Sequence, residues 1–158
     1  MRTSKITVSV IGSHNRSPQN DEKAYQVGKI IAGLGAVLVC GGLDGIMAAA
    51  ARGAKDAGGL TIGLLPGTDK ADANPYIDIA LPTSIGFARN AMVACSADIV
   101  VALPGSHGTN SEICYGLVYD RPVIDFGGWN IKGMIPAANL EETAALLQEH
   151  IERIKKRL

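Results

Sequence analysis

The stretch IVVALPGSHGTNSEI, residues 99–113, decides how this chain folds. Its first part, residues 99–103, is an unbroken apolar run, which is the pattern of a strand buried on both faces of a parallel sheet. Pro104 and Gly105 end this strand, and the residues that follow predict a helix. The stretch therefore predicts a buried strand that leads through a glycine-rich turn into a helix.

The turn has the composition of a phosphate-binding site. We expect Gly105 and Gly108 to adopt positive φ angles and to come close to a ligand, and Ser106 or Thr109 to cap the helix. Free N–H groups at the positive end of a helix dipole favour an anion such as phosphate. Glu112, three residues after Thr109, is either half of a capping box or a carboxylate aimed into this site.

The composition predicts one domain that spans residues 1–158. The chain is 158 residues long and 47% hydrophobic, which is enough for a sizeable core. Lys and Arg total 15, as do Asp and Glu, so the formal net charge is zero. This balance provides no basic surface for nucleic acid or for an anionic membrane, and neither is expected as a partner. A phosphorylated small molecule is compatible with it.

Cysteine usage and the N-terminal sequence favour a cytoplasmic protein. Cys40, Cys95 and Cys114 are odd in number, have no metal-ligand spacing and lie among apolar residues. We therefore expect buried, reduced thiols and no zinc site. Residues 1–12 lack the long apolar core and cleavage site of a secretory signal, and no apolar run is long enough to cross a membrane.

Strand-like and helix-like segments alternate along the chain. Apolar and β-branched runs predict strands, and apolar residues at helical spacing predict the helices between them. The strands are expected at residues 5–12, 36–40, 60–65, 77–81, 99–103 and 121–126. The helices are expected at residues 21–34, around 47–51, at 86–95, from the glycine turn to 120, and at 140–158. Loops are expected at residues 66–75 and 127–136.

This alternation predicts an α/β fold, a single-domain Rossmann-like three-layer αβα sandwich with a mostly parallel, doubly wound sheet. Ligands bind such sheets beyond the carboxyl ends of the strands, where the winding direction reverses. If the strand at 99–103 lies beside the strand at 5–12, residues 12–14 and residues 105–109 meet at that crevice. Residues 41–42 then lie at its flank.

The glycine turns also have a purely structural interpretation. Gly41, Gly42 and Gly45 serve either tight packing or contact with a ligand, and three glycine turns at one sheet edge favour contact. Neither GxGxxG nor GxxxxGK[ST] is complete. Nothing therefore supports NAD as a cofactor or hydrolysis of a nucleoside triphosphate.

Several polar side chains near these turns are candidates for contact with a ligand. Arg89 offers a planar fork to phosphate, or it forms a surface ion pair. One interpretation of Glu112 is that it takes part in glycosidic bond cleavage, and the other is that it only stabilises the helix N-terminus. His14 and His107 are surface residues, or they face one oxoanion together without ligating a metal directly. His150, in the last helix, is expected to be structural.

Several stretches resemble the Lonely Guy (LOG) superfamily, also called lysine decarboxylase-like. PGSHGTNSE, residues 104–112, is similar to the superfamily motif PGGxGTxxE, and VIGSH at residues 10–14 adds to the likeness. Three further stretches resemble the branch of molybdenum cofactor carrier-like proteins, and these are VCGGLDGIMAAAARGAKDAGGLTIGLLPG (39–67), ANPYIDIALPT (73–83) and ARN (88–90).

The carrier branch implies a protein that binds molybdenum cofactor, a phosphorylated molybdopterin, or molybdate, and holds it without chemistry. The phosphate or oxoanion would bind to the glycine turn, and polar side chains around it would bind the rest. The residues that the resemblance implies in binding are Gly12, Ser13, His14, Gly41, Gly42, Arg89, Asn90, Gly105, Ser106, His107, Gly108, Thr109 and Glu112.

The cytokinin-activating branch implies an alternative. Its enzymes cleave a nucleoside 5′-monophosphate into free base and ribose 5-phosphate, with an arginine followed by lysine and with adjacent glutamates in the motif. Here Asn90 follows Arg89, and Ser111 precedes Glu112. The alternative is therefore a phosphoribohydrolase in which Arg89 and Glu112 are catalytic and part of the pattern is missing. A nucleotide sensor without turnover is a third interpretation.

The resemblance also implies partners. Members of the superfamily assemble as homo-oligomers, so a dimer or tetramer is expected, and the apolar stripe of the last helix is compatible with this. Molybdoenzymes or cofactor-synthesis proteins are further expected partners of a carrier. The sequence leaves open whether residues 67–76 close over the site.

Overall fold

The computed structural model describes residues 4–158, and their fold is built on a sheet of seven parallel strands. The order in the sheet is β4-β3-β2-β1-β5-β6-β7. The strands are β1 (Thr7–Ile11), β2 (Val37–Cys40), β3 (Thr61–Leu65), β4 (Ile79–Pro82), β5 (Ile99–Ala102), β6 (Val123–Asp125) and β7 (Ile135–Pro136).

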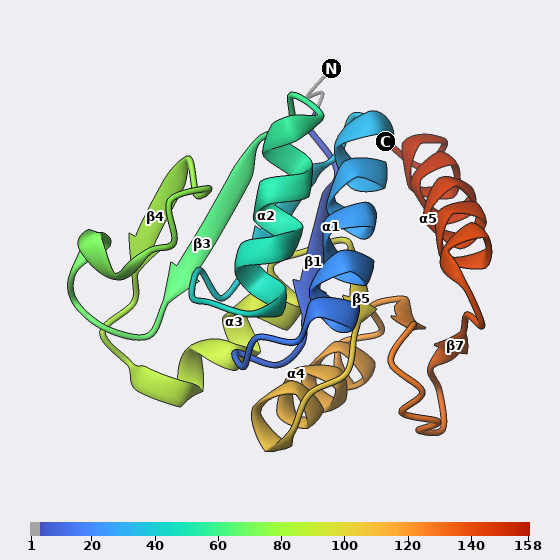
Figure 1. Cartoon of the computed structure of the whole chain (residues 1–158). Coiled ribbons are helices and arrows are strands. Elements are labelled where there is room, and N and C mark those ends of the chain that lie inside the picture. The colour runs from blue at the N-terminus through green and yellow to red at the C-terminus, as the bar shows by residue number, and fades with distance from the viewer. Residues whose placement is uncertain (1–3) are drawn as a thin grey trace.

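Helices cover both faces of this sheet, which confirms the expected αβα sandwich (Figure 1). Helices α1, α2 and α5 lie on one face, and α3 and α4 lie on the other. The α-helices are α1 (Pro18–Gly33), α2 (Ile46–Asp56), α3 (Arg89–Cys95), α4 (His107–Val118) and α5 (Leu140–Lys155). Two short 3₁₀ helices are η1 (Lys70–Asp72) and η2 (Gly86–Ala88).

Two apolar cores result, because alternate residues of each buried strand point to opposite faces. Val8 and Val10 of β1 pack toward α1 and α2, whereas Ile11 packs toward α3 and α4. In β5, Val101 belongs to the first core and Val100 to the second. The central strands are therefore apolar on both sides, as the unbroken runs in the sequence predict.

The winding direction reverses at β1, as expected. Val8 pairs with Leu38 of β2 on one side and with Ile99 of β5 on the other. The loop after β1 is held at both sides, because Ser13 N donates to Pro104 O at 2.9 Å and Ile46 N donates to Ser13 O at 2.9 Å. The carboxyl ends of β1, β2 and β5 thus meet at one place.

The boundaries of several elements differ from the expectation. Helix α1 begins at Pro18 rather than at residue 21, because proline suits the first position of a helix, where no N–H is needed. Helix α4 ends at Val118, and Asp120 follows with a φ of 55° that no helix continues. The stretch 86–95 begins as the 3₁₀ helix η2 and only then becomes α3.

Both expected loops contain regular structure that the sequence analysis missed. Residues 66–75 include η1, which Asp69 caps by accepting a hydrogen bond from Ala71 N at 2.8 Å. Residues 127–136 end in β7, where Ile135 pairs with Ile124 of β6. A strand of two residues has no periodicity to detect, so only the neighbouring strand reveals it.

The cysteines are only partly buried, so that expectation was wrong for two of them. Cys40 is buried, and burial raises the pKa of its thiol to about 12. Cys95 is half-buried and Cys114 is exposed on α4. All three are free thiols.

In residues 4–158 there is no helix with both the length and the apolarity needed to span a bilayer. The secretory-signal interpretation concerned residues 1–12, and residues 1–3 lie outside the described range.

Helices α1 and α2 approach so closely that glycine is required at their contact. A Cβ atom added at Gly28 would lie 2.0 Å from Ala50 O, and one added at Gly53 would lie 2.0 Å from Tyr25 O. The small residues at these positions let the backbones of the two helices come into contact. The layer above the sheet therefore depends on the absence of a side chain at these two positions.

We expect Gly28→Ala to lower the free energy of unfolding by about 2 kcal/mol, because the methyl group forces α1 and α2 apart. Gly33→Ala is the matched control in the same helix, since nothing lies within 4 Å of the added Cβ. It should be neutral or slightly stabilising. Urea denaturation of both variants measures the difference, and equal effects would contradict the prediction.

Candidate functional site

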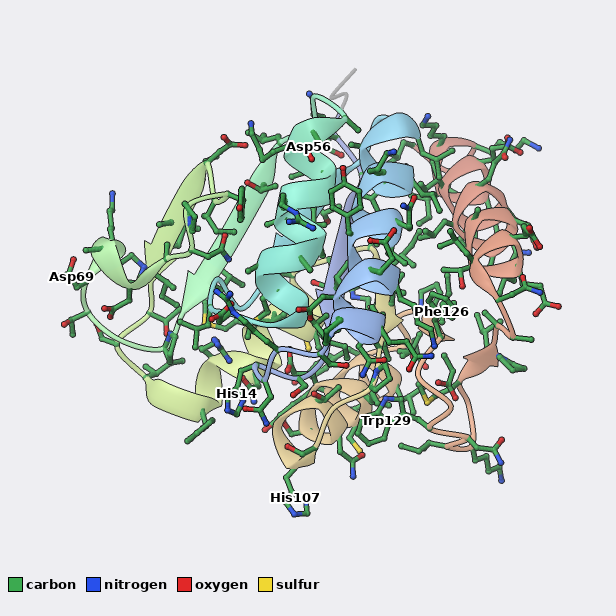
Figure 2. All side chains as sticks on the ribbon, viewed as in Figure 1. His14, Asp56, Asp69, His107, Phe126 and Trp129 are labelled. Atoms are coloured by element: carbon green, nitrogen blue, oxygen red, sulfur yellow. The ribbon has the colours of Figure 1, made fainter. Side chains whose placement is uncertain are left out.

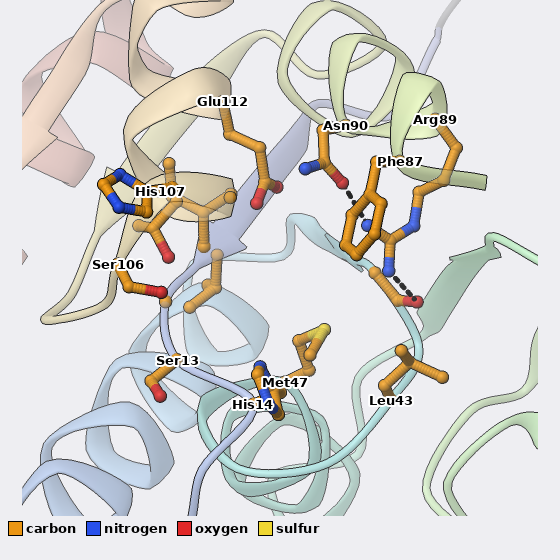
Figure 3. A pocket seen from close by; sticks show the side chains of 16 residues that line it. Ser13, His14, Leu43, Met47, Phe87, Arg89, Asn90, Ser106, His107 and Glu112 are labelled. Atoms are coloured by element: carbon orange, nitrogen blue, oxygen red, sulfur yellow. Dashed lines mark hydrogen bonds between the residues drawn. The ribbon is translucent and has the colours of Figure 1, made fainter.

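A cavity of about 320 Å³ lies at the carboxyl ends of β1, β2 and β5, where the winding reverses (Figure 3). Its size is that of a small-molecule site. The residues that line it are Val10, Ile11, Gly12, Ser13, His14, Gly41, Leu43, Met47, Phe87, Arg89, Asn90, Ser106, His107, Gly108, Thr109 and Glu112.

One wall of this cavity is the turn between β5 and α4. Helix α4 begins at His107, and Ser106 is the N-cap residue, but its side chain accepts no capping hydrogen bond. Among residues 4–158, no acceptor receives a hydrogen bond from the backbone N–H groups of residues 105–109. These N–H groups at the positive end of the helix dipole are therefore available to an anion.

Thr109 does not cap the helix, although the sequence allowed it. It lies within the first turn of α4, is buried and borders the cavity. The positive φ angles expected at Gly105 and Gly108 are also absent, and positive φ occurs instead at Gly42 and Gly45 beside β2.

Gly105 and Gly42 are needed for packing rather than for contact with the cavity. A Cβ on Gly105 would lie 2.1 Å from Thr109 Oγ1, and one on Gly42 would lie 2.8 Å from Leu65 Cδ2. Neither residue lines the cavity, whereas Gly41 does. A Cβ on Gly41 would meet the Arg89 guanidinium at 2.6 Å. Of the two roles that the sequence left open, packing therefore applies to Gly42 and Gly105, and contact with the cavity applies to Gly41.

Arg89 is buried at the base of the cavity, so the surface ion pair considered from the sequence is wrong. Its Nε donates to Leu64 O at 2.7 Å and its Nη2 to Gly41 O at 3.2 Å. Its Nη1 donates to Asn90 Oδ1. Within the described residues, no carboxylate forms an ion pair with this guanidinium.

The hydrogen bonds continue from Arg89 to the first turn of α4. Asn90 Nδ2 donates to Ser111 Oγ at 3.3 Å, and Ser111 Oγ donates to Gly108 O at 2.6 Å. Dashed lines in Figure 3 mark the bonds of Arg89 to Asn90 and to Gly41. Most N–H donors of Arg89 are bonded to protein acceptors. Its main contribution to ligand binding is therefore a fixed positive charge rather than a pair of free N–H donors for phosphate.

Glu112 points from α4 into the cavity (Figure 3). It is buried, and no hydrogen bond of its side chain is found in residues 4–158, which excludes the capping box there. Burial raises the pKa of Glu112 to about 8, although the charge of Arg89 acts in the opposite direction. The carboxyl group is therefore largely protonated at neutral pH.

The two histidines lie at the rim rather than at the base of the cavity. His14 and His107 are both exposed, and Figure 2 shows His107 projecting outward from the end of α4. The sequence placed both side chains near the site, and the structure keeps them at its opening. In the described part of the chain, no group of three or more His, Cys, Asp or Glu side chains is arranged to hold a metal ion.

The sequence analysis missed the apolar part of the site. Leu43 lies in the turn before α2, Met47 lies in the first turn of α2, and Phe87 lies in η2. Leu43 follows the Gly41-Gly42 pair, and Phe87 comes two residues before Arg89. Closeness in sequence to these predicted site residues was the one indication that Leu43 and Phe87 line the cavity. Val10 and Ile11 also line the cavity from the end of β1.

This chain is similar to known proteins of one family. Residues 5–154 match the model of the SLOG cluster4 family. An uncharacterized protein of Archaeoglobus fulgidus is 41% identical over 112 residues, which are 71% of this chain and 74% of that protein.

Two solved structures share the fold over nearly their whole length. The molybdenum cofactor binding protein of Rippkaea orientalis is 33% identical with a TM-score of 0.87, covering 95% of this chain and 99% of that one. The molybdenum cofactor carrier protein of Chlamydomonas reinhardtii is 30% identical with a TM-score of 0.84, covering 94% and 99%.

The raised pKa of Glu112 predicts how stability depends on pH. In the unfolded chain this carboxyl ionises near its ordinary pKa of 4.5, whereas in the folded protein it stays protonated up to about pH 8. The free energy of unfolding should therefore fall as the pH rises through this interval. We expect Glu112→Gln to remove this slope and to add on the order of 2 kcal/mol at pH 7.

Urea denaturation between pH 4 and 9 measures this effect. Glu141→Gln, at an exposed position in the first turn of α5, is the control and should leave the slope in place. A Glu112→Gln variant with the wild-type slope would show that the carboxyl is ionised in the folded protein.

Proposed function

The chain belongs to the SLOG cluster4 family, and on that basis we propose that it binds and carries molybdenum cofactor or a related phosphorylated or oxoanionic ligand. One observation carries this proposal. In residues 4–158, a buried arginine without an ion-pair partner and backbone N–H groups without an acceptor lie at one cavity, in a fold that two molybdenum cofactor proteins share over nearly their whole length.

The residues present fit this ligand. Molybdenum cofactor is a pterin with one phosphate and a dithiolene that holds molybdenum with oxo groups. The N–H groups of residues 105–109 and the Thr109 hydroxyl suit the phosphate. Ser13 and His14, on the loop after β1, supply further polar groups at the same opening. The cofactor, when bound, would supply the redox-active metal, and the protein holds and shields it.

The charges of the cavity also favour an anion. Burial lowers the pKa of Arg89 from its ordinary value, but a guanidinium stays protonated in proteins. Glu112 is mostly neutral at pH 7, so it does not cancel this charge. Since no ion pair of Arg89 is found within the described residues and Glu112 is mostly neutral, an anionic ligand would provide the counter-charge of this guanidinium.

Cleavage of a nucleoside 5′-monophosphate is the second candidate function. A glutamic acid with a pKa of about 8 is suited to protonate a leaving group, which favours this alternative. Glycosidic hydrolysis usually needs a second carboxylate, however, and among residues 4–158 only the acidic side chain of Glu112 lines the cavity. Binding of a ligand without catalysis needs no second carboxylate, so the carrier function agrees better with the residues of this site.

The proposal has further parts that follow from the carrier role. We propose a cytoplasmic protein that assembles as a dimer or tetramer and exchanges its ligand with molybdoenzymes or cofactor-synthesis proteins. Molybdate would bind to the same N–H groups as the phosphate, because both are tetrahedral oxoanions.

We expect Gly108→Asp to weaken binding of molybdenum cofactor by roughly 100-fold, because it places a carboxylate beside the phosphate. The site of substitution is open, since the nearest atom to an added Cβ is Asn90 Nδ2 at 3.6 Å. An acidic residue in the first turn of a helix also favours folding. Anaerobic calorimetry with the isolated cofactor measures the affinity.

Gly108→Asn is the control for this variant, because it has the same shape without the charge. It should retain affinity within about tenfold, since only the repulsion is removed. Equal loss in both variants would mean that shape rather than charge decides binding. A wild-type protein that binds neither the cofactor nor molybdate would refute the proposal.

The second candidate function has its own test. We expect no free base when the wild-type protein is incubated with a panel of nucleoside 5′-monophosphates and the products are separated by chromatography. Release of base by the wild type, lost in Glu112→Gln, would instead establish the hydrolase.

A further inference from the structure

Phe87 is an unusually exposed aromatic residue at the edge of the cavity. The residue is 87% exposed, although burial of a phenylalanine is strongly favourable. It nevertheless lines the cavity from η2, two residues before Arg89. The ring thus lies where a bound ligand would cover it.

The backbone holds Phe87 firmly in this position. Thr83 N donates to Leu65 O at 2.9 Å, Ser84 N to Gly67 O at 3.0 Å and Gly86 N to Pro66 O at 2.9 Å. Ser84 has a φ of 63°, which is rare for a residue other than glycine and costs free energy. The segment before Phe87 therefore keeps a strained turn that fixes where the ring is presented.

The cavity has two chemically different sides. In the view of Figure 3, Ser106 and His107 lie on one side, and Phe87 and Leu43 lie on the other. The first side carries the free N–H groups of the turn before α4, whereas the second presents the ring of Phe87 and the side chain of Leu43 next to the buried guanidinium of Arg89. A ligand with an anionic group at one end and a flat ring at the other matches this division.

We propose that Phe87 determines specificity by packing against a flat heteroaromatic ring of the ligand while the anionic group binds to residues 105–109. This inference rests on the proposed function, and it narrows the ligand to a phosphorylated heteroaromatic compound. Pterins and purines share this chemistry, because both are flat bicyclic rings. Inorganic phosphate and molybdate lack the ring and do not use Phe87.

Calorimetric titrations of three variants test this inference. The probes are isolated molybdenum cofactor, guanosine 5′-monophosphate and molybdate. For the ring-bearing probe that the wild type binds, we expect Phe87→Ala to lower the affinity by roughly tenfold or more. The affinity of Phe87→Tyr should stay within about threefold of the wild type. Molybdate affinity should be the same in all variants. The preferred ring-bearing probe tells a pterin from a purine.

Ile85→Ala is the matched control, because Ile85 is 49% exposed in the same segment but does not line the cavity. It should bind every probe like the wild type. The inference is overturned if Phe87→Ala keeps full affinity for the ring-bearing probe, or if it loses molybdate equally. It is also overturned if size-exclusion chromatography shows that Phe87→Ala changes the oligomeric state, since Phe87 would then be an interface residue. Failure of the proposed function looks different, because the wild type itself then binds none of the probes.

Discussion

The buried guanidinium of Arg89 is the constraint on which the site depends. It donates to the carbonyl of Leu64 in β3 and to that of Gly41 just after β2, and so it ties the ends of two strands to α3. Asn90 and Ser111 extend these hydrogen bonds to the first turn of α4. Burying a charge is costly unless hydrogen bonds compensate, and here Leu64 O, Gly41 O and the Asn90 side chain accept from the guanidinium. The same bonds that stabilise this cation therefore also fix the walls of the cavity.

Arg89 and Glu112 form an unusual pair, because both are buried in one cavity and yet they make no ion pair in the described residues. Desolvation acts on the two groups in opposite ways. It leaves the guanidinium charged and the carboxyl mostly protonated at neutral pH, so the cavity has a net positive charge. An anion that enters would stabilise the protonated form of Glu112 further, which links binding to proton uptake.

The doubly wound, parallel sheet followed from the sequence, because buried parallel strands are unbroken apolar runs and right-handed crossovers leave few arrangements. The turn before α4 was also predictable, because Pro104 and Gly105 end the apolar strand and serine and threonine suit the start of a helix. The strand β7 and the exposed ring of Phe87 were not, because two residues have no period and an isolated aromatic residue has no pattern. The φ angles of Gly105 and Gly108 were predicted wrongly, since close packing rather than a left-handed turn explains Gly105.

The wall at which we propose that an anion binds consists of main-chain N–H groups, and this has an evolutionary consequence. Such groups are present whatever side chains occupy residues 106 and 107, so mutation leaves them intact as long as α4 starts at the same place. Side chains at the rim, such as His14 and Leu43, can change without loss of the charged end of the site. A lineage with this architecture can therefore acquire a new ligand by exchanging a few rim residues, while the free N–H groups at the start of α4 are inherited with the fold.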